Sequence, residues 1–200
     1  MKKRPSETEI ARMAQKLMEL LALQPEPRKS LVMKMMEGPV GNTYFTAPAS
    51  SRAEFHSCYP GGLLVHSMNV IQNLNRLAKS LCPGQYEDNT LIFVGAFHDL
   101  GKVGDGENEY YLPNSSDWHV KKGMLYETNK DCEIAATEDR TLYLLQRYEI
   151  KLNSEEYLAI KLSDGQYCQS NDKYKMKEPL LALLLHWADR CACEIEKLKD

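Results

Sequence analysis

Apolar residues in this chain recur every three or four positions, and proline or glycine closes nearly every run in which they do. This spacing places apolar side chains on one face of an α-helix, whereas a half-buried β-strand would alternate apolar and polar residues. The clearest run is 61–81, which ends at Cys82-Pro83-Gly84. Because no segment shows a convincing strand pattern, the sequence predicts an all-α fold with about seven helices.

The expected helices start and end at recognisable residues. Ser6 and Ser154 stand where a capping hydroxyl is expected, and Pro179 suits the first helical turn. Gly101 stands where a left-handed residue often closes a helix. We expect helices over about 6–23, 29–36, 61–81, 89–100, 138–148, 154–162 and 178–197. The stretches 41–60 and 103–122 lack any period, so we expect loops there, and a loop as long as the second is often functional.

Composition excludes several functional classes. The chain has 200 residues, and its 25 Lys+Arg against 28 Asp+Glu give a net charge of −3. That balance argues against electrostatic attachment to DNA or to anionic lipid. The longest apolar runs, 91–97 and 180–185, fall short of the ~18 residues of a membrane span. A hydrophobic content of 43% nevertheless allows a buried core.

The expected location is the cytoplasm. The basic N-terminus is not followed by an apolar stretch, so we expect no secretory signal. The six cysteines include no CxxC pair, and scattered cysteines of this kind are typical of reduced intracellular thiols.

Two histidines and two aspartates lie where burial would leave them in need of partners. His98 and Asp99 end an otherwise apolar stretch, and Asp189 follows the apolar run 180–185. His66 lies within a third expected helix. Burying such groups is costly unless each finds a partner. Three helices therefore offer two imidazoles and two carboxylates to a common centre.

A single divalent ion would partner all four side chains at once. Mixed nitrogen and oxygen ligation suits Mn²⁺, Fe²⁺, Co²⁺ or Zn²⁺ and suits Ca²⁺ less well; Mg²⁺ is a further candidate ion. The C-terminal end of the 89–100 helix also carries partial negative charge that favours a cation. Between Asp99 and Asp189 only His119 and His186 remain as further imidazoles. We therefore predict one metal ion, bound by His66, His98, Asp99 and Asp189.

Three elements of the sequence resemble the HD-domain metal-dependent phosphohydrolases. They are Tyr59-Pro60-Gly61-Gly62-Leu63-Leu64-Val65-His66, Phe97-His98-Asp99-Leu100-Gly101-Lys102 and His186-Trp187-Ala188-Asp189. Their order, H…HD…D, is the motif of that family. The stretches 104–119 and 163–167 also look similar to HD proteins encoded by large bacteriophages, which would place the protein in the host cytoplasm.

The resemblance implies an all-α fold and hydrolysis of a phosphoester or phosphoanhydride by a metal-activated water. The resemblance covers about 55–191. Because a chain of 200 residues suits one domain, we expect a single HD-type domain over 1–200, with N-terminal helices in 1–37 and an HD core in 55–191. We expect a small nucleotide or another phosphorylated compound as substrate. The near-neutral charge does not favour long nucleic acid, and the sequence does not indicate an oligomeric state.

Five residues are candidates for catalysis or substrate binding. Asp99 can ligate through one oxygen and keep the other near the water. Lys102 could offer a positive charge to a phosphate, or it could be a solvated lysine at a helix end. His56, His119 and Asp164 are candidate substrate contacts, although an exposed loop or plain turn chemistry would also explain them. A base could stack on the aromatic residues Tyr110, Tyr111, Trp118, Tyr126 and Tyr167.

Two other functions stay open. One is a 3′–5′ exonuclease or cyclic-nucleotide phosphodiesterase, and the other is a non-catalytic module that binds a nucleotide. The two extra histidines that many binuclear HD enzymes carry between the HD pair and the final Asp are not both available, because His119 is the only spare one before His186. It also has Gly101 and Lys102 where the nucleotidase branch carries an acidic residue after the HD pair. Because of both departures, the substrates of those branches are weaker guides to the substrate of this protein.

Overall fold

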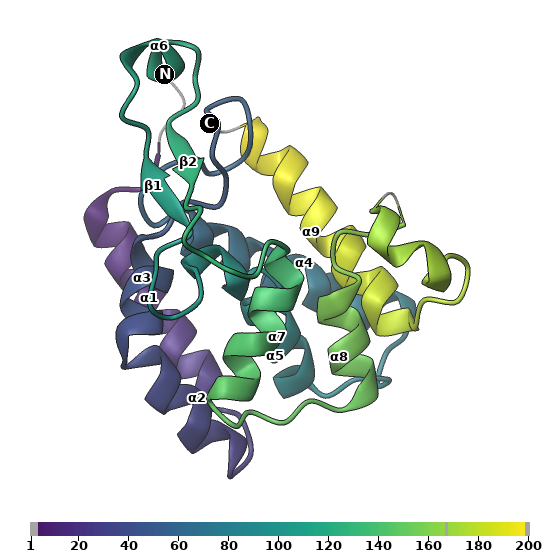
Figure 1. Cartoon of the computed structure of the whole chain (residues 1–200). Helices are drawn as coiled ribbons and strands as arrows, with labels where there is room; N and C mark the ends of the chain where they lie inside the picture. The colour runs from purple at the N-terminus through teal and green to yellow at the C-terminus, as the bar shows by residue number, and fades with distance from the viewer. Residues whose placement is uncertain (1–3, 167, 199–200) are drawn as a thin grey trace.

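The computed structural model describes residues 4–166 and 168–198, and helices dominate this part of the chain (Figure 1). The α-helices are α1 (Glu7–Leu21), α2 (Arg28–Met36), α3 (Pro39–Thr46), α4 (Gly62–Leu81), α5 (Asp88–Phe97), α6 (Asp117–Lys121), α7 (Thr137–Arg147), α8 (Ser154–Lys161) and α9 (Leu180–Lys197). Two 3₁₀ helices, η1 (Leu100–Val103) and η2 (Gln169–Tyr174), and two short strands, β1 (Tyr111–Pro113) and β2 (Tyr126–Thr128), complete the described elements. The fold is all-α, as the periodicity predicts.

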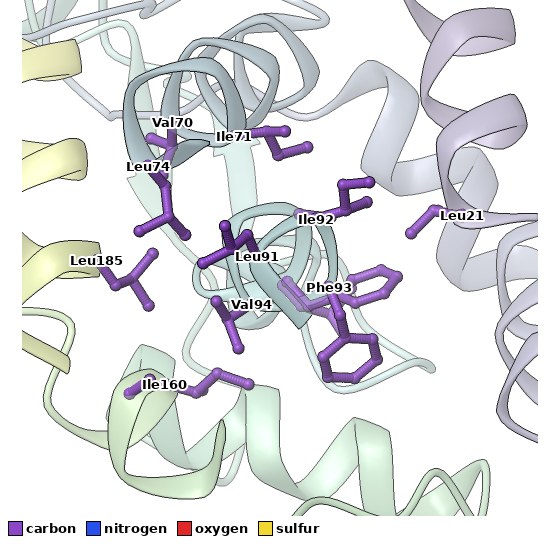
Figure 2. Close-up of a cluster of buried hydrophobic side chains, with 14 of the residues drawn as sticks. Leu21, Val70, Ile71, Leu74, Leu91, Ile92, Phe93, Val94, Ile160 and Leu185 are labelled. Carbon is purple, nitrogen blue, oxygen red and sulfur yellow. The ribbon is translucent and has the colours of Figure 1, made fainter. Parts of the chain in front are cut away.

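Helix α5 lies at the centre of the molecule. Its residues from Leu91 to Phe97 are all buried, which is expected of a helix that is apolar on every side. Figure 2 shows side chains from α1, α4, α8 and α9 directed toward it, among them Leu21, Leu74, Ile160 and Leu185. Packing on all sides fixes the position of α5, and with it the position of the two polar residues that follow.

The N-terminal helices belong to the same core. Helix α1 packs against α4 and α5, and Leu17 and Leu21 on its inner face are fully buried. Its start is fixed by a capping box in which Ser6 and Glu9 each accept a hydrogen bond from the other's backbone N–H.

Helix α3 occupies part of the segment 41–60, where the sequence predicts a loop, and that prediction is wrong at its N-terminal end. Pro39 stands at the first helical position, which suits its fixed φ angle. The buried Tyr44 hydroxyl donates a hydrogen bond to the carbonyl of Ala96 at 2.6 Å. Tertiary contact therefore stabilises a helix whose residues show no period.

The second expected loop, 103–122, also contains structure, so the expectation of no strand is wrong locally. β1 and β2 pair antiparallel, with Tyr111 opposite Thr128 and Pro113 opposite Tyr126. Figure 1 shows this hairpin projecting from the helices with α6 at its tip. None of the five residues of α6 is buried. No helix in the described part of the chain is long and apolar enough to cross a bilayer.

Three expected helix ends differ from the structure. Helix α5 ends at Phe97 rather than at Leu100, and Gly101 lies inside η1. Helix α8 is capped by Asn153, whose side chain accepts from the N–H of Glu156, and not by Ser154. Pro179 is the N-cap of α9 rather than its first helical residue.

Candidate metal centre

Helix α4 packs against both α5 and α9, and this brings three of the predicted ligands together. His66 lies on α4, His98 directly follows α5, and Asp189 lies on α9. The distance from Asp189 Oδ1 is 2.9 Å to His66 Nε2 and 3.8 Å to His98 Nε2. One ligand atom from each residue lies within 4.8 Å of the others.

The donor set fits a metal ion because two buried nitrogens have no hydrogen-bond partner. Within the described residues, His66 Nε2 and His98 Nε2 are inaccessible to solvent and accept or donate no hydrogen bond. Leaving such atoms unpaired is costly unless something else binds them. Both face the Asp189 carboxylate, so nitrogen and oxygen donors converge on a common point.

The opposite ring nitrogens fix the orientation of both imidazoles. His98 Nδ1 lies 3.0 Å from the carbonyl of Gly95, which can only accept, so Nδ1 carries the proton. His66 Nδ1 lies 3.2 Å from the Glu196 carboxylate. Metal-ligating histidines commonly donate their second N–H to a carbonyl or a carboxylate, and this leaves Nε2 free for the ion.

Glu196 is a functional residue that the sequence reasoning missed. Its side chain is 4% exposed and also accepts hydrogen bonds from Ser57 Oγ and Asn69 Nδ2, both at 2.8 Å. Burial opposes the charged form, but these donors and His66 hold the pKa of Glu196 below its usual value. Because Glu196 lies seven residues after Asp189, both face one side of α9, and that spacing was the available signal.

Asp99 faces the same centre from the turn after α5. Its Oδ2 atom lies 3.7 Å from His66 Nε2 and 3.5 Å from His98 Nε2. Lys102 Nζ lies 2.6 Å from this oxygen. Burial opposes ionisation of Asp99, whereas Lys102 and the histidines lower its pKa.

Lys102 is not the solvated lysine that one interpretation of the sequence describes. Its side chain is 16% exposed, and despite burial the carboxylate of Asp99 raises its pKa. Lys102 therefore carries a positive charge next to the centre.

Helix α7 holds the turn that presents His98 and Asp99. A Cβ atom on Gly101 would lie 2.0 Å from the carbonyl oxygen of Thr137, so only glycine permits this close approach. The Gly101 N–H donates to Thr141 Oγ1 at 2.8 Å, and the buried Arg140 donates through Nε to the Gly101 carbonyl at 2.8 Å. Sequence patterns give no sign of this role of Arg140, because Gly101 lies 39 residues away along the chain.

His56 lies at the edge of the centre, in the loop before α4. Its ring centroid is 4.5 Å from that of His66, and its Nε2 atom is 3.6 Å from Cys193 Sγ. Burial lowers the pKa of His56 to about 4, and the neighbouring charges of His66 and Lys102 act in the same direction.

The structure places Asp164 near the centre and His119 far from it. Although solvent reaches Asp164, the surrounding protein raises its pKa, and Asp99 and Glu138 add to the rise. His186 Nδ1 donates to the Ser163 carbonyl at 2.9 Å and so supports this turn. His119 lies in α6 at the hairpin tip, where its ring packs against Trp118.

A small cavity of about 210 Å³ lies beside Lys102, under the hairpin. Its lining includes three of the predicted aromatic residues, Tyr110, Tyr111 and Tyr126. The ring centroids of Tyr110 and Tyr111 are 4.8 Å apart. Trp118 is 61% exposed at the hairpin tip, and Tyr167 lies outside the described residues.

The centre attracts positive charge. Burial disfavours a charged imidazole, yet the carboxylates of Asp189 and Glu196 raise the pKa of His66 to about 10. Asp189 is also buried, and its pKa falls well below the usual value because both histidines face it. A buried cluster of side chains with this preference suits a divalent cation.

The HD domain family model matches residues 63–193, so the chain belongs to the HD-domain family. The matched segment contains all four predicted ligands, and it indicates a hydrolase that uses a divalent metal ion. Searches of curated proteins and of solved structures each returned no match.

Proposed function

We propose that this protein is a metal-dependent phosphohydrolase that cleaves a phosphoester or phosphoanhydride bond of a nucleotide. His66, His98, Asp99 and Asp189 would hold one divalent ion, chosen from Mn²⁺, Fe²⁺, Co²⁺, Zn²⁺ and Mg²⁺. The observation that carries this proposal is the pair of buried, unpartnered Nε2 atoms that face the carboxylates of Asp189 and Asp99.

When bound, a divalent ion lowers the pKa of a coordinated water and polarises a phosphoryl oxygen. Asp99 Oδ2 faces the histidines and binds Lys102, so Asp99 Oδ1 can accept a hydrogen bond from the attacking water. Lys102 Nζ neutralises negative charge on the phosphoryl group, and its fixed position means that no reorganisation is needed during the reaction.

The cavity beside Lys102 supports a nucleotide as substrate. The flat rings of Tyr110, Tyr111 and Tyr126 offer a surface on which a base can stack. We infer that the phosphate binds between this cavity and the metal centre, with His56 and Asp164 at its edges. The chain charge of −3 favours a small nucleotide over a long nucleic acid. His119 would reach only a substrate that extends to the hairpin tip.

The proposal is tested by measuring turnover of a nucleotide panel by the full chain with Mn²⁺. The panel contains nucleoside mono-, di- and triphosphates, cyclic nucleotides and short oligonucleotides. We expect His98→Ala to remove both metal and turnover while far-UV helicity is kept, and His119→Ala to keep the metal. Stoichiometric metal in His98→Ala, or nucleotide binding by the metal-loaded wild type without any turnover, would contradict the proposal.

Lys102→Met separates charge stabilisation from metal binding. We expect kcat to fall by on the order of 10²-fold or more, as for other preorganised electrostatic partners. Metal affinity should not fall, because the substitution removes a positive charge from the neighbourhood of the ion. An unchanged kcat would contradict the role proposed for Lys102.

A further inference from the structure

A second group of donors overlaps the metal centre on the side of α9. His56, His66 and Cys193 each place one ligand atom within 4.8 Å of the others. His66 belongs to both groups, so the second group adjoins the first. The sequence reasoning treated Cys193 only as a reduced thiol, and no role in the proposed reaction uses it.

Helix geometry directs the Cys193 sulfur toward the ligands. Cys193 lies four residues after Asp189, and residues at this spacing are neighbours on one helix face. Its Sγ atom is 3.4 Å from Asp189 Oδ1 and 3.6 Å from His56 Nε2. The residue is 7% exposed, so the sulfur points into the protein rather than toward solvent.

These distances suit donors to a common ion. A zinc ion lies about 2.3 Å from a thiolate sulfur and about 2.1 Å from a nitrogen or oxygen donor. At the tetrahedral angle that zinc prefers, two such donors are separated by about 3.6 Å. The distance of 3.4 Å between Cys193 Sγ and Asp189 Oδ1 is close to that separation.

We propose that Cys193 supplies a sulfur donor to the ion that His66, His98, Asp99 and Asp189 would hold. When the metal–sulfur bond forms, the S–H proton is released to solvent, because only the thiolate ligates. His56 Nε2–H then donates a hydrogen bond to the sulfur. This inference rests on the proposed metal centre. It also restricts the choice of metal ion, because a thiolate favours Zn²⁺, Fe²⁺ or Co²⁺ over Mg²⁺ and Mn²⁺.

Cobalt substitution tests the sulfur donor directly. The full chain is stripped of metal with a chelator and titrated with Co²⁺, while bound cobalt and the near-ultraviolet absorption are both measured. We expect one bound Co²⁺ and a sulfur-to-cobalt charge-transfer band. Cys193→Ser and Cys193→Ala should bind Co²⁺ without the band, whereas the matched control Cys191→Ser, an exposed thiol on the same helix, should keep it.

Zn²⁺ affinity gives a second readout. In Cys193→Ser we expect it to fall by about 10–100-fold, the size of loss seen even for partners outside the ligand set, with Mg²⁺ affinity unchanged. If wild type binds Co²⁺ but shows no charge-transfer band, the proposal of a sulfur donor is overturned, while the proposed hydrolase centre is unaffected. A band that persists in both Cys193 variants also overturns it. Failure of wild type to bind any Co²⁺ overturns the centre itself.

Discussion

Glu196 illustrates how one buried carboxylate can control a metal ligand without touching the ion. It lies 3.2 Å from His66 Nδ1 and is itself fixed by Ser57 and Asn69. With an ion bound, this contact would keep the proton on Nδ1 and leave the lone pair of Nε2 directed at the ion. Glu196 is therefore a positioning residue in the proposed mechanism.

We expect Glu196→Gln to lower metal affinity by about 10–100-fold, because an amide neither balances the imidazole charge nor holds its tautomer as firmly. The matched control is Glu194→Gln, an exposed residue on the same helix that pairs with Arg190 and Lys197. Metal affinity is measured by competition with a chromophoric chelator. Equal affinities for Glu196→Gln and wild type would show that His66 is held by other contacts.

At the residue scale, the sequence identifies His66, His98, Asp99 and Asp189 as a group because polar residues in apolar helices need partners. The structure brings these four together, whereas their role as ligands stays a prediction. Glu196 and Cys193 escaped notice because the histidines that they contact lie about 130 residues away along the chain. The periodicity of apolar residues indicates which face of a helix is buried, but it does not indicate which distant side chains contact that face.

At the element scale, the turn between α5 and η1 depends on its contact with α7. Gly101 sits against the carbonyl of Thr137, and Arg140 and Thr141 bond to the Gly101 backbone. The sequence predicts a glycine near this point but gives a different reason for it. It predicts a left-handed helix end, whereas the actual constraint is the close approach of a distant helix.

We expect Gly101→Ala to lower the free energy of unfolding by about 1–3 kcal/mol, the usual cost of overpacking. Urea denaturation measures the loss. The control is Gly38→Ala, whose added Cβ would meet its nearest neighbour at 3.4 Å and should cost less. Metal affinity of Gly101→Ala should fall too, because His98 and Asp99 belong to the displaced turn. Equal stability of the two variants would show that α7 can move away without penalty.

The sequence predicts some helices and strands better than others, because only some of them have apolar residues at regular spacing. Helices with a strong apolar face, such as α4 and α9, were expected within two residues of their actual bounds. Helix α3 and the β1–β2 hairpin were missed because their residues show neither helical nor strand periodicity. Their backbone hydrogen bonds depend on tertiary contacts, such as that of Tyr44 with Ala96.

At the scale of the whole molecule, the N-terminal helices and the matched HD segment share one core. Leu17 and Leu21 are buried together with residues of α4, α5, α8 and α9. We propose on this ground that 1–200 forms a single domain, with 1–37 as an integral part of it. Loss of α1 would expose the face of α5 next to Leu21 (Figure 2).

Metal binding should stabilise the entire domain, because its proposed ligands come from three helices that meet only in the native state. At a free ion concentration of about 100 times Kd, the stabilisation is about 2.7 kcal/mol. For a chain of this size, Tm should then rise by roughly 5–11 °C. Differential scanning fluorimetry with and without the ion measures this shift. His98→Ala should show no comparable shift, and a shift of equal size there would place the ion elsewhere.

Burial differs sharply between the helix that leads to the centre and the hairpin that covers the cavity. Backbone amides in α5 are expected to exchange with solvent only through global opening, whereas those of α6 exchange through local fraying. The turn that carries His98 and Asp99 follows α5 directly, so we expect these two candidate ligands to keep their positions while α6 frays. Hydrogen exchange measured by mass spectrometry should then show slow exchange in 91–97 and fast exchange in 117–121.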